Sequence, residues 1–357
     1  MLQPGYEIKL YHPEYLPQVI KVLSYLWGEN QKQNLSYFQW KYHENPYTDD
    51  PLGIVCLYEG KVVGFRGYFA TKWQIKEKNA EFYILCPGDT CVDPDHRLKK
   101  LSLIMGNRAM EEYKDKYKIF LNFSSTKNSV PGYLKMGFVP LIDKAYINRD
   151  NIFVIISYIK TVNKKVGLHE GKISFDEFDE IIVTETPKPK EMSAIVNRQN
   201  SHKSKITLSQ DEKFFKWRFG NCRRKYIFYY YHKNKMVTGY VVMKVSENNK
   251  RGFIVDFSAD ETVVIEKILD FIIKFKHYDI LSIANYSINE NISWVLNKLQ
   301  FKDNSLTRLI EKRRDGECPL FLRPVRYDFT ESEFFIEDLD IRNIENWSLK
   351  EICSDGA

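Results

Sequence analysis

The sequence predicts a mixed α/β (α+β) fold made of two tandem domains, the second a degenerate copy of the first. Two observations support this prediction. Segments with strand patterning alternate with segments of helical periodicity along all 357 residues, as in sheets whose strands are connected by helices. The order of these segments then recurs after an offset of roughly 163 to 177 residues, which is typical of an internal repeat.

Hydrophobic periodicity defines the elements of the first half. Leu16, Val19 and Leu23 fall on one face of the first predicted helix, and Glu59-Gly60 separates two strands as a hairpin turn does. The predicted elements are a strand at 6–10, helices at 14–27 and 35–42, a hairpin at 53–58 and 61–66, a strand at 81–92, a helix at 98–113, a strand at 118–123, a short helix at 130–136 and a strand at 145–147.

The second half repeats this order of elements. Its segment Phe214-Phe-Lys-Trp217-Arg-Phe219 resembles Tyr37-Phe-Gln-Trp40-Lys-Tyr42 of the first half. The predicted elements are a strand at 181–183, a helix at 190–198, strands at 226–231, 236–240 and 252–257, a helix at 262–275, a strand at 280–283 and a helix at 292–299. We expect domains at 1–160 and 173–320, a linker at 161–172, and an acidic tail at 321–357 that packs on the body.

Charge is distributed unevenly along the chain. The formal net charge is +6, from 53 Lys and Arg against 47 Asp and Glu. From Asp328 onward nine acidic and two basic residues give −7, so the first 327 residues carry +13. A basic body attracts phosphate-bearing ligands, although no segment resembles a nucleic-acid-binding module.

Composition excludes several classes of protein. With 43% hydrophobic and 28% charged residues, the chain is globular in composition and not disordered throughout. It has no run of 18 apolar residues and no leader pattern, so no membrane span or signal peptide is predicted and the cytoplasm is the expected compartment. Its six cysteines form no C-x-x-C pair, which favours free thiols and argues against a metal site.

The most informative segment follows the predicted strand at 81–92. It reads Gly88-Asp-Thr-Cys-Val92-Asp-Pro94-Asp-His-Arg97-Leu-Lys-Lys-Leu-Ser102-Leu. A helix is predicted to begin in it, and the unpaired N–H groups of a helix start favour a phosphate or pyrophosphate. Arg97, Lys99 and Lys100 add positive charge at the same place.

This segment resembles the pyrophosphate loop of the GCN5-related N-acetyltransferase (GNAT) superfamily, whose pattern is Val-x-Pro-x-x-Arg-Gly-x-Gly-x-Gly/Ala. Val92, Pro94 and Arg97 match, whereas leucine, lysine and serine stand where the family has glycines that let the backbone approach coenzyme A. The resemblance implies acetyl-CoA as co-substrate and no metal. The residues that it implies for binding are Cys91, Val92, Arg97, Leu98, Lys99, Lys100, Leu101, Ser102, Leu103 and Asn128.

A second block, Asn128-Ser-Val-Pro-Gly-Tyr133-Leu-Lys-Met-Gly137-Phe138, resembles the Asn-…-Tyr-x-Lys-x-Gly-Phe pattern of the same family. The resemblance implies that Asn128 contacts the pantetheine arm and that Tyr133 is the general acid. In such a reaction an amine attacks a thioester carbonyl. A backbone N–H near Val92 can hold the developing oxyanion, and Tyr133 can protonate the leaving thiolate. Asp89 is the predicted general base, with Glu81 and His96 as weaker candidates.

The second half lacks a comparable phosphate loop. After its central strand the chain reads Ser258-Ala-Asp-Glu-Thr262, and two carboxylates at that helix start would repel a pyrophosphate. We therefore expect coenzyme A only in the first domain, with the second a catalytically silent copy that shapes the acceptor site.

Three functions compete at this point. The leading one is an N-acetyltransferase that moves an acetyl group from acetyl-CoA to a primary amine of a small molecule, with an amino sugar or nucleotide-linked amino sugar as the family-level acceptor class. One alternative is a tandem-GNAT transferase that uses aminoacyl-tRNA, which the basic body would suit. The other is a non-catalytic protein that binds coenzyme A or a metabolite, which the missing glycines would suit. The two motif blocks favour the first, while acceptor, acyl-chain preference and oligomeric state stay open.

Overall fold

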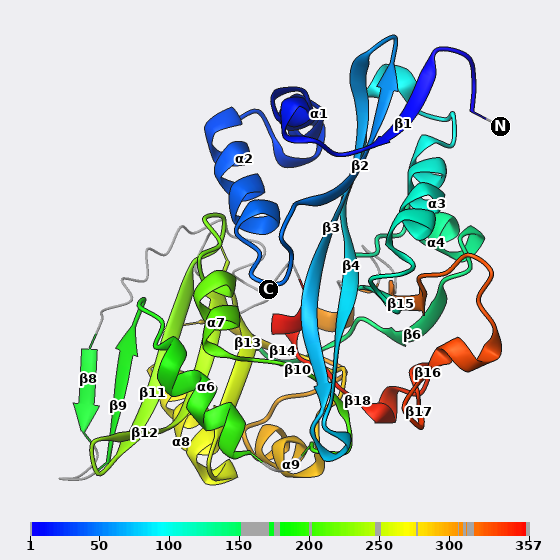
Figure 1. Cartoon of the computed structure of the whole chain (residues 1–357). Helices are drawn as coiled ribbons and strands as arrows, with labels where there is room; N and C mark the ends of the chain where they lie inside the picture. The colour runs from blue at the N-terminus through cyan, green and yellow to red at the C-terminus, as the bar shows by residue number, and fades with distance from the viewer. Residues whose placement is uncertain are drawn as a thin grey trace.

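The computed structural model describes residues 2–150, 171–174, 179–199, 202–246, 251–275, 278–305, 307–309, 312 and 318–354. The chain forms two large sheets, one above the other, and the long ribbon of strands β3 and β4 runs from the upper half alongside the lower one (Figure 1). The predicted linker at 161–172 falls almost wholly outside the described residues. The mixed α/β class predicted from the sequence is confirmed.

The first sheet has the strand order β1-β2-β3-β4-β5-β15-β6, with β10 on β3 and β18 on β10. Its strands run antiparallel except at the pairs β4–β5 and β10–β18, which are parallel. The bounds are β1 (Tyr6–Leu10), β2 (Leu52–Tyr58), β3 (Lys61–Ile75), β4 (Ala80–Val92), β5 (Ile119–Asn122), β6 (Val139–Asp143), β10 (Ile206–Leu208), β15 (Pro319–Pro324) and β18 (Trp347–Ser348).

The second sheet has the order β8-β9-β11-β12-β13-β14-β7. It too contains an antiparallel run that leads to one parallel pair, β13–β14, and then to an antiparallel strand. The bounds are β7 (Tyr146–Asp150), β8 (Gly171–Ser174), β9 (Asp179–Thr184), β11 (Tyr226–Lys233), β12 (Met236–Val245), β13 (Arg251–Ala259) and β14 (Ile280–Ala284).

The two sheets exchange strands, because the first takes β10, β15 and β18 from the later part of the chain and the second takes β7 from the earlier part. The late strand β15 lies between β5 and β6 in the first sheet, and the early strand β7 lies against β14 in the second. Each half of the chain therefore completes the sheet of the other, and neither sheet is built from one continuous segment. The expected domain limits stay a prediction, since the sheets draw strands from both sides of them.

The helices lie near their predicted positions, with shifts at their ends. The predicted helix at 98–113 begins three residues later, because residues 98–100 form a loop with two left-handed residues. The helices are α1 (Leu16–Trp27), α2 (Gln31–Phe38) with a π-helical turn at Gln39–His43, α3 (Leu101–Tyr113), α4 (Val130–Lys135), α6 (Pro189–Arg198), α7 (Glu212–Arg218), α8 (Thr262–Lys274) and α9 (Glu290–Lys298).

The two tryptophans that the sequence aligned with each other meet between the halves. The rings of Trp40 and Trp217 stack with centroids 5.5 Å apart. Each indole N–H donates to the backbone carbonyl of the other residue, at 2.6 Å from Trp40 and 2.8 Å from Trp217. This reciprocal pair is buried and belongs to a hydrophobic cluster that draws residues from both sheets, such as Trp73 and Phe215. The halves thus share one core.

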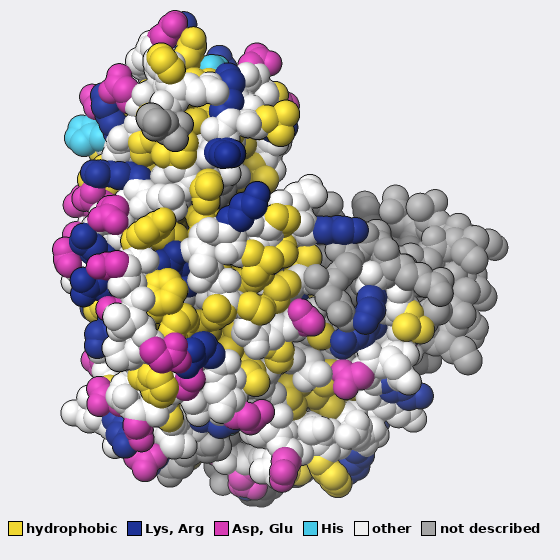
Figure 2. Space-filling model, turned by 90° about the vertical axis from the view of Figure 1, so that its right-hand side faces the viewer, with side chains coloured by type: hydrophobic (Ala, Val, Ile, Leu, Met, Phe, Trp, Pro, Cys, Tyr) yellow, Lys and Arg dark blue, Asp and Glu magenta, His cyan; other side chains and the backbone are white. Residues whose placement is uncertain are grey.

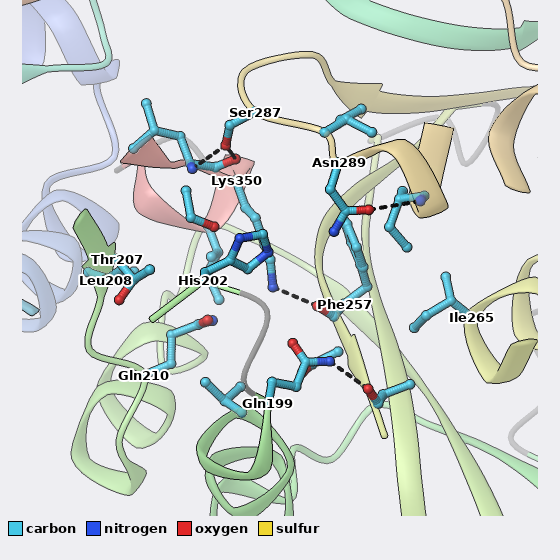
Figure 3. A pocket seen from close by; sticks show the side chains of 18 of the residues that line it. Gln199, His202, Thr207, Leu208, Gln210, Phe257, Ile265, Ser287, Asn289 and Lys350 are labelled. Atoms are coloured by element: carbon cyan, nitrogen blue, oxygen red, sulfur yellow. Dashed lines mark hydrogen bonds between the residues drawn. The ribbon is translucent and has the colours of Figure 1, made fainter. Parts of the chain in front are cut away.

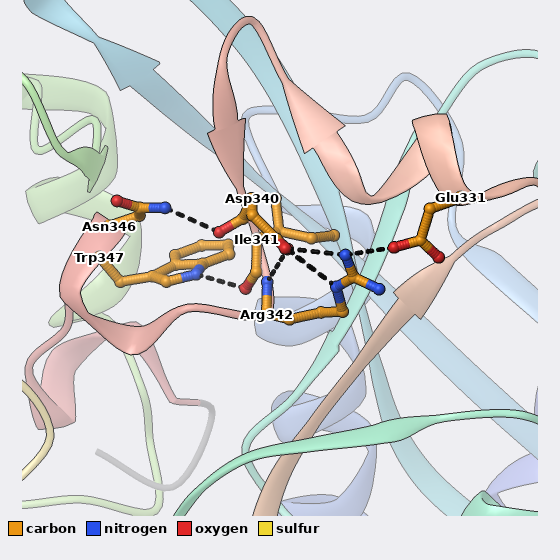
Figure 4. A network of polar contacts seen from close by, with 6 residues as sticks. All are labelled: Glu331, Asp340, Ile341, Arg342, Asn346 and Trp347. Carbon is orange, nitrogen blue, oxygen red and sulfur yellow. Dashed lines mark hydrogen bonds and ion pairs between the residues drawn. The ribbon is translucent and has the colours of Figure 1, made fainter.

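The C-terminal residues fold back onto the body. Trp347 is fully buried, donates its indole N–H to the carbonyl of Ile341 at 2.7 Å and packs edge-on against Trp73. Arg342 binds the carboxylates of Asp340 at 2.8 Å and Glu331 at 2.5 Å, and so neutralises acidic charge within the segment (Figure 4). Apolar burial, and not attraction to the basic body alone, accounts for the docking.

The tryptophan pair gives a test of the shared core. In Trp40→Phe the buried carbonyl of Trp217 loses its donor, which should lower the free energy of unfolding by about 1–3 kcal/mol. Trp294→Phe on α9, where the ring is 60% exposed, is the matched control and should change stability by less than about 0.5 kcal/mol. Urea unfolding followed by circular dichroism measures both. Equal stabilities would show that the pair does not couple the halves.

Candidate functional site

A β-bulge in β4 opens the first sheet beside β5. Gly88 pairs with Gly67 and Thr90 with Arg66, so Asp89 is the extra residue of the bulge. The parallel pairing of β4 with β5 is confined to two residue pairs near Ile84 and Leu85. Beyond them the two strands diverge. Bulges of this kind re-aim side chains at the edge of a functional site.

The loop after β4 keeps an unusual backbone without glycine. Leu98 and Lys100 have φ angles of +63° and +60°. Non-glycine residues in this region cost about 1–2 kcal/mol each, and such strain is typical of functional sites. These are two of the three positions where the family pattern has glycine, so the chain retains the left-handed conformation that glycine would supply. Helix α3 begins directly afterwards and directs its first N–H groups at the loop.

The predicted binding residues of the loop range from exposed to buried. Arg97 is exposed and donates from Nε to the carbonyl of Val92 at 3.1 Å, while Lys99 donates to the hydroxyl of Tyr6 at 2.7 Å. Cys91 is buried, and burial raises the pKa of its thiol to about 11, so it stays protonated. Leu98, Lys100 and Ser102 are exposed, Leu101 is buried, and Val92 and Leu103 are partly buried.

Tyr133 lies at the start of α4 in a cage of aromatic rings. It is 8% exposed, stacks on Phe321 of the exchanged strand β15 with centroids 5.7 Å apart, and meets Phe138 edge-on at 5.0 Å. The guanidinium of Arg66 lies 5.4 Å from its ring centroid. The structure therefore brings Tyr133 next to Arg66 of β3, which pairs with Thr90 beside the bulge, while the role of Tyr133 as general acid stays a prediction.

Arg66 is a functional candidate that the sequence did not single out. It is 3% exposed and donates to the carbonyl of Ser102 at 3.2 Å, while its Nε has no partner in the described part of the chain. Burial lowers its pKa, but interactions with Tyr68 and Tyr133 outweigh this and raise the pKa above its ordinary value. Among the described residues no carboxylate pairs with it. A buried, uncompensated cation is costly, which favours an anion beside it.

Two asparagines near the site differ in burial and in hydrogen bonding. Asn128, the residue chosen from the sequence, is exposed in the turn before α4. Asn122 is fully buried at the end of β5, where the strands diverge, and its side-chain N–H₂ has no partner among the described residues. An asparagine that ends a buried strand was the signal available in the sequence. We add Asn122 to the candidate site, and the role of Asn128 stays a prediction.

Asp89 is held by three donors from the first helices. Lys41 binds it at 2.5 Å, Tyr42 donates its hydroxyl at 2.6 Å and Trp27 donates its indole N–H at 3.0 Å. The Lys41 side chain is only 1% exposed, so this is a buried ion pair. The general-base role stays a prediction, and the geometry gives Asp89 a structural task, because it anchors the bulge. Of the weaker candidates, Glu81 pairs with Lys72 and His96 bonds to Tyr6.

A basic cavity adjoins this network from the second half. It has a volume of about 380 Å³, and four basic side chains line it. Arg223 stacks on the ring of Tyr37 at 4.5 Å and donates to the carbonyl of Trp27. Burial lowers the pKa of Lys244 to about 8 although Glu351 at 3.8 Å acts against it, and Lys225 pairs with Glu185 at 2.7 Å, so Arg223 and Arg224 carry the positive charge of the cavity. An anionic group would be favoured here. The four basic residues are Arg223, Arg224, Lys225 and Lys244.

The outer face of α3, α4 and the C-terminal segment is mixed in character. Figure 2 views the molecule from this side and shows hydrophobic side chains gathered in its middle, with basic and acidic ones scattered around them. Within the described residues, no helix is long and apolar enough to cross a membrane. Nor do three His, Cys, Asp or Glu side chains of that part of the chain gather into a metal site.

Residues 7–141 match the family model described as an acetyltransferase (GNAT) domain. The fold is GNAT-like. Among solved structures, the chain resembles a probable N-acyltransferase from Enterococcus faecalis, with a TM-score of 0.61 and 11% identity over 92% of this chain and 74% of that one. It resembles a GCN5-related N-acetyltransferase from Anabaena variabilis to the same TM-score, with 12% identity over 90% and 73% of the two chains.

A further structural relative is a tandem GNAT protein from the clavulanic acid biosynthesis pathway. Its TM-score is 0.52, with 11% identity over 90% of this chain and 98% of that one. At these identities the likeness shows the fold alone. No curated protein matches the sequence.

Asp89 offers a test that separates a structural from a catalytic carboxylate. Asp89→Asn leaves Lys41 charged and buried without a counter-ion, which should cost about 3–5 kcal/mol of stability. Adding Lys41→Met should restore most of that loss, because the unpaired charge is then gone. Urea unfolding of the two variants measures this, with Asp95→Asn in the exposed loop as the control. An Asp89→Asn variant that is stable but inactive would instead identify a general base.

Proposed function

We propose that this protein is an acyl-CoA-dependent N-acetyltransferase that acetylates a primary amine of a small molecule. The observation that carries the proposal is the loop before α3, where Leu98 and Lys100 hold the left-handed backbone of a pyrophosphate loop although neither is glycine. Strain of this kind is typical of functional sites, and α3 begins directly after it with first N–H groups that lack a partner within the helix ladder.

Coenzyme A fits the residues of this site. Of the amides from Arg97 to Leu103, those of Arg97 and Leu103 already donate to the carbonyls of Pro94 and Lys100, so a pyrophosphate would bind the amides between them, with the charges of Arg97, Lys99 and Lys100 beside it. The amide of Asn122 is placed where β4 and β5 diverge, for the polar pantetheine arm. When bound, acetyl-CoA supplies a thioester whose carbonyl carbon an amine can attack.

Tyr133 and Arg66 serve the departure of the thiolate. The Tyr133 hydroxyl donates its proton to sulfur as the C–S bond breaks, and the nearby guanidinium of Arg66 stabilises the phenolate that remains. The proton that the attacking nitrogen loses restores the phenol through solvent, so protons balance over the cycle. Backbone N–H groups of β4 near Val92 hold the negative charge that develops on the carbonyl oxygen.

The second half contributes the acceptor side in this proposal. Both sheets share one order of strands, each has a bulge just beyond the last parallel pair, and equivalent tryptophans meet between them. We infer two copies of one GNAT-like domain, of which the second is catalytically silent. The basic cavity around Arg223 and Arg224 favours an acceptor with an anionic group. A nucleotide-linked amino sugar has that chemistry, because its phosphates are anionic and its sugar carries the primary amine.

Tyr133→Phe tests the catalytic assignment. The variant keeps the ring and its packing but removes the proton donor, so turnover of acetyl-CoA with a panel of amino sugars and nucleotide-linked amino sugars should fall by roughly two to four orders of magnitude. Affinity for acetyl-CoA and thermal stability should stay at the wild-type values.

Two further variants complete this experiment. Tyr117→Phe removes another buried hydroxyl far from the loop and should leave turnover unchanged. Arg97→Glu should weaken acetyl-CoA binding, because it reverses charge beside the pyrophosphate. Full turnover in Tyr133→Phe would remove Tyr133 from the mechanism. Wild-type protein that binds acetyl-CoA but acetylates no amine would favour the non-catalytic alternative, and tight tRNA binding would favour the tRNA-dependent one.

A further inference from the structure

A second cavity lies in the other half of the molecule, where β13 and β14 diverge (Figure 3). Its volume is about 620 Å³, within the range of small-molecule sites. Parallel pairing of the strands ends at Ile254 and Ile283, and the cavity opens beyond that point. The starts of α8 and α9, the end of α6 and residues 348–353 of the C-terminal segment complete its walls.

The apolar side chains on the walls of this cavity are mainly aliphatic. Phe257 is the single aromatic residue among the described hydrophobic side chains that line it. Branched aliphatic walls suit a flexible hydrocarbon chain better than a flat ring, which gains from stacking partners. The aliphatic side chains include Ile254, Ile265, Ile283, Ile292, Leu349 and Ile352.

The acidic side chains at this cavity already have partners: Asp260 and Glu351 lie on its walls, and Asp256 lies behind Gln210 and Lys350. Asp256 binds Lys350 at 2.9 Å and the hydroxyl of Tyr240 at 2.8 Å. Asp260 binds the guanidinium of Arg198 through both oxygens at 2.9 Å. Glu351 accepts from two tyrosine hydroxyls and lies near Lys244. These carboxylates are neutralised by their neighbours, so they do not set the charge that a ligand meets.

Three polar groups on the walls are available to a ligand. Ser258 is 2% exposed, and its hydroxyl has no partner among the described residues. His202 projects into the cavity, and its Nδ1 also lacks a partner there. Lys76 has only a 3.5 Å hydrogen bond to the carbonyl of Val196 and, within the described chain, no carboxylate. Burial lowers the pKa of Lys76, with Lys203 adding to the effect, so a nearby anion would be stabilising.

Coenzyme A does not suit this cavity. Glu261 stands at the start of α8, where a pyrophosphate would need to lie, and its carboxylate would repel one. Lys350 donates to the carbonyl of Phe257 at 2.6 Å and so occupies a backbone acceptor at the divergence. The cavity is also remote from the first site, because Gln74 on its wall lies seven residues along β3 from Gly67 at the bulge, roughly 23 Å.

We propose that this cavity binds an aliphatic carboxylic acid, with the hydrocarbon chain along the isoleucine walls. Lys76 supplies the counter-charge, and Ser258 and His202 supply hydrogen bonds. Burial together with Lys350 and Lys205 lowers the pKa of His202 to about 4, so its ring is neutral at pH 7 and offers one donor and one acceptor. This binding site is independent of the proposed transferase activity.

Isothermal titration of the full-length protein with decanoate, methyl decanoate and 1-decanol tests the proposal. Decanoate should bind at one site, at least tenfold more tightly than the two neutral probes. Lys76→Met should weaken decanoate binding at least tenfold without changing the affinity for decanol. Lys76→Arg, which keeps the positive charge, should bind decanoate as tightly as the wild-type protein. Lys78→Met is the matched control on the same turn, where the lysine pairs with Asp338 away from the cavity, and should have no effect.

The outcomes separate this site from the acetyl-CoA site. Arg97→Glu should leave decanoate binding unchanged, and Lys76→Met should leave acetyl-CoA binding unchanged. Ser258→Ala should weaken decanoate about three- to tenfold through the lost hydrogen bond, while thermal unfolding shows that the variant is folded. Equal affinity for decanoate and decanol, or no binding of any probe, would overturn the proposal. Decanoate binding without any acetyl-CoA binding would leave it standing and refute the transferase instead.

Discussion

The buried ion pair between Lys41 and Asp89 holds the feature on which the candidate site depends. Asp89 is the extra residue of the β4 bulge and has a φ of +28°, a strained conformation for a residue with a side chain. Three donors fix it from the helical side of the sheet. Beyond its pairing with β5, strand β4 continues through the fixed bulge. The loop that follows then reaches the start of α3. Because a buried ion pair is weak evidence for stability, we infer that this one contributes mainly the geometry of the bulge.

Two glycines make room for this arrangement. A side chain at Gly67 would overlap the hydroxyl of Tyr42, and one at Gly88 would come within 2.9 Å of the Lys41 ammonium. The second sheet solves the same problem with other residues. Its bulge is at Val255, and the neighbouring Asp256 binds Tyr240, Gln210 and Lys350. The lysine that pairs with Asp256 comes from the C-terminal segment. This segment therefore crosses the opening between β13 and β14, and the opening suits a different ligand.

Local signals in the sequence predicted most of the elements and the order in which they occur. The hairpin turn at Glu59-Gly60, with both residues at positive φ, and the equivalence of Trp40 with Trp217 are examples. The exchanged strand β15 was missed, because its terminal prolines argue against a strand with neighbours on both sides. The partners of Asp89 were missed because Lys41 reaches it across 48 residues from a π-helical turn, which local periodicity does not predict.

The site residues divide in the same way, into those that local sequence predicts and those that only the structure reveals. The motif blocks indicated the loop and Tyr133, whose positions depend on local sequence and on the strands that precede them. Arg66 and Asn122 emerged only from the structure, because each buries a side-chain N–H group that has no partner among the described residues. From the sequence alone, an arginine in a strand is expected to be exposed, because arginine is rarely fully buried.

Hydrogen–deuterium exchange of the wild-type protein with and without acetyl-CoA tests where the cofactor binds. We expect it on the loop and α3 of the first half, with its pantetheine arm between β4 and β5. Saturating acetyl-CoA should therefore slow exchange in peptides that cover residues 93–104 and 122–137, and should leave residues 258–265 unchanged. Protection at 258–265, or no protection in the first half, would contradict the account.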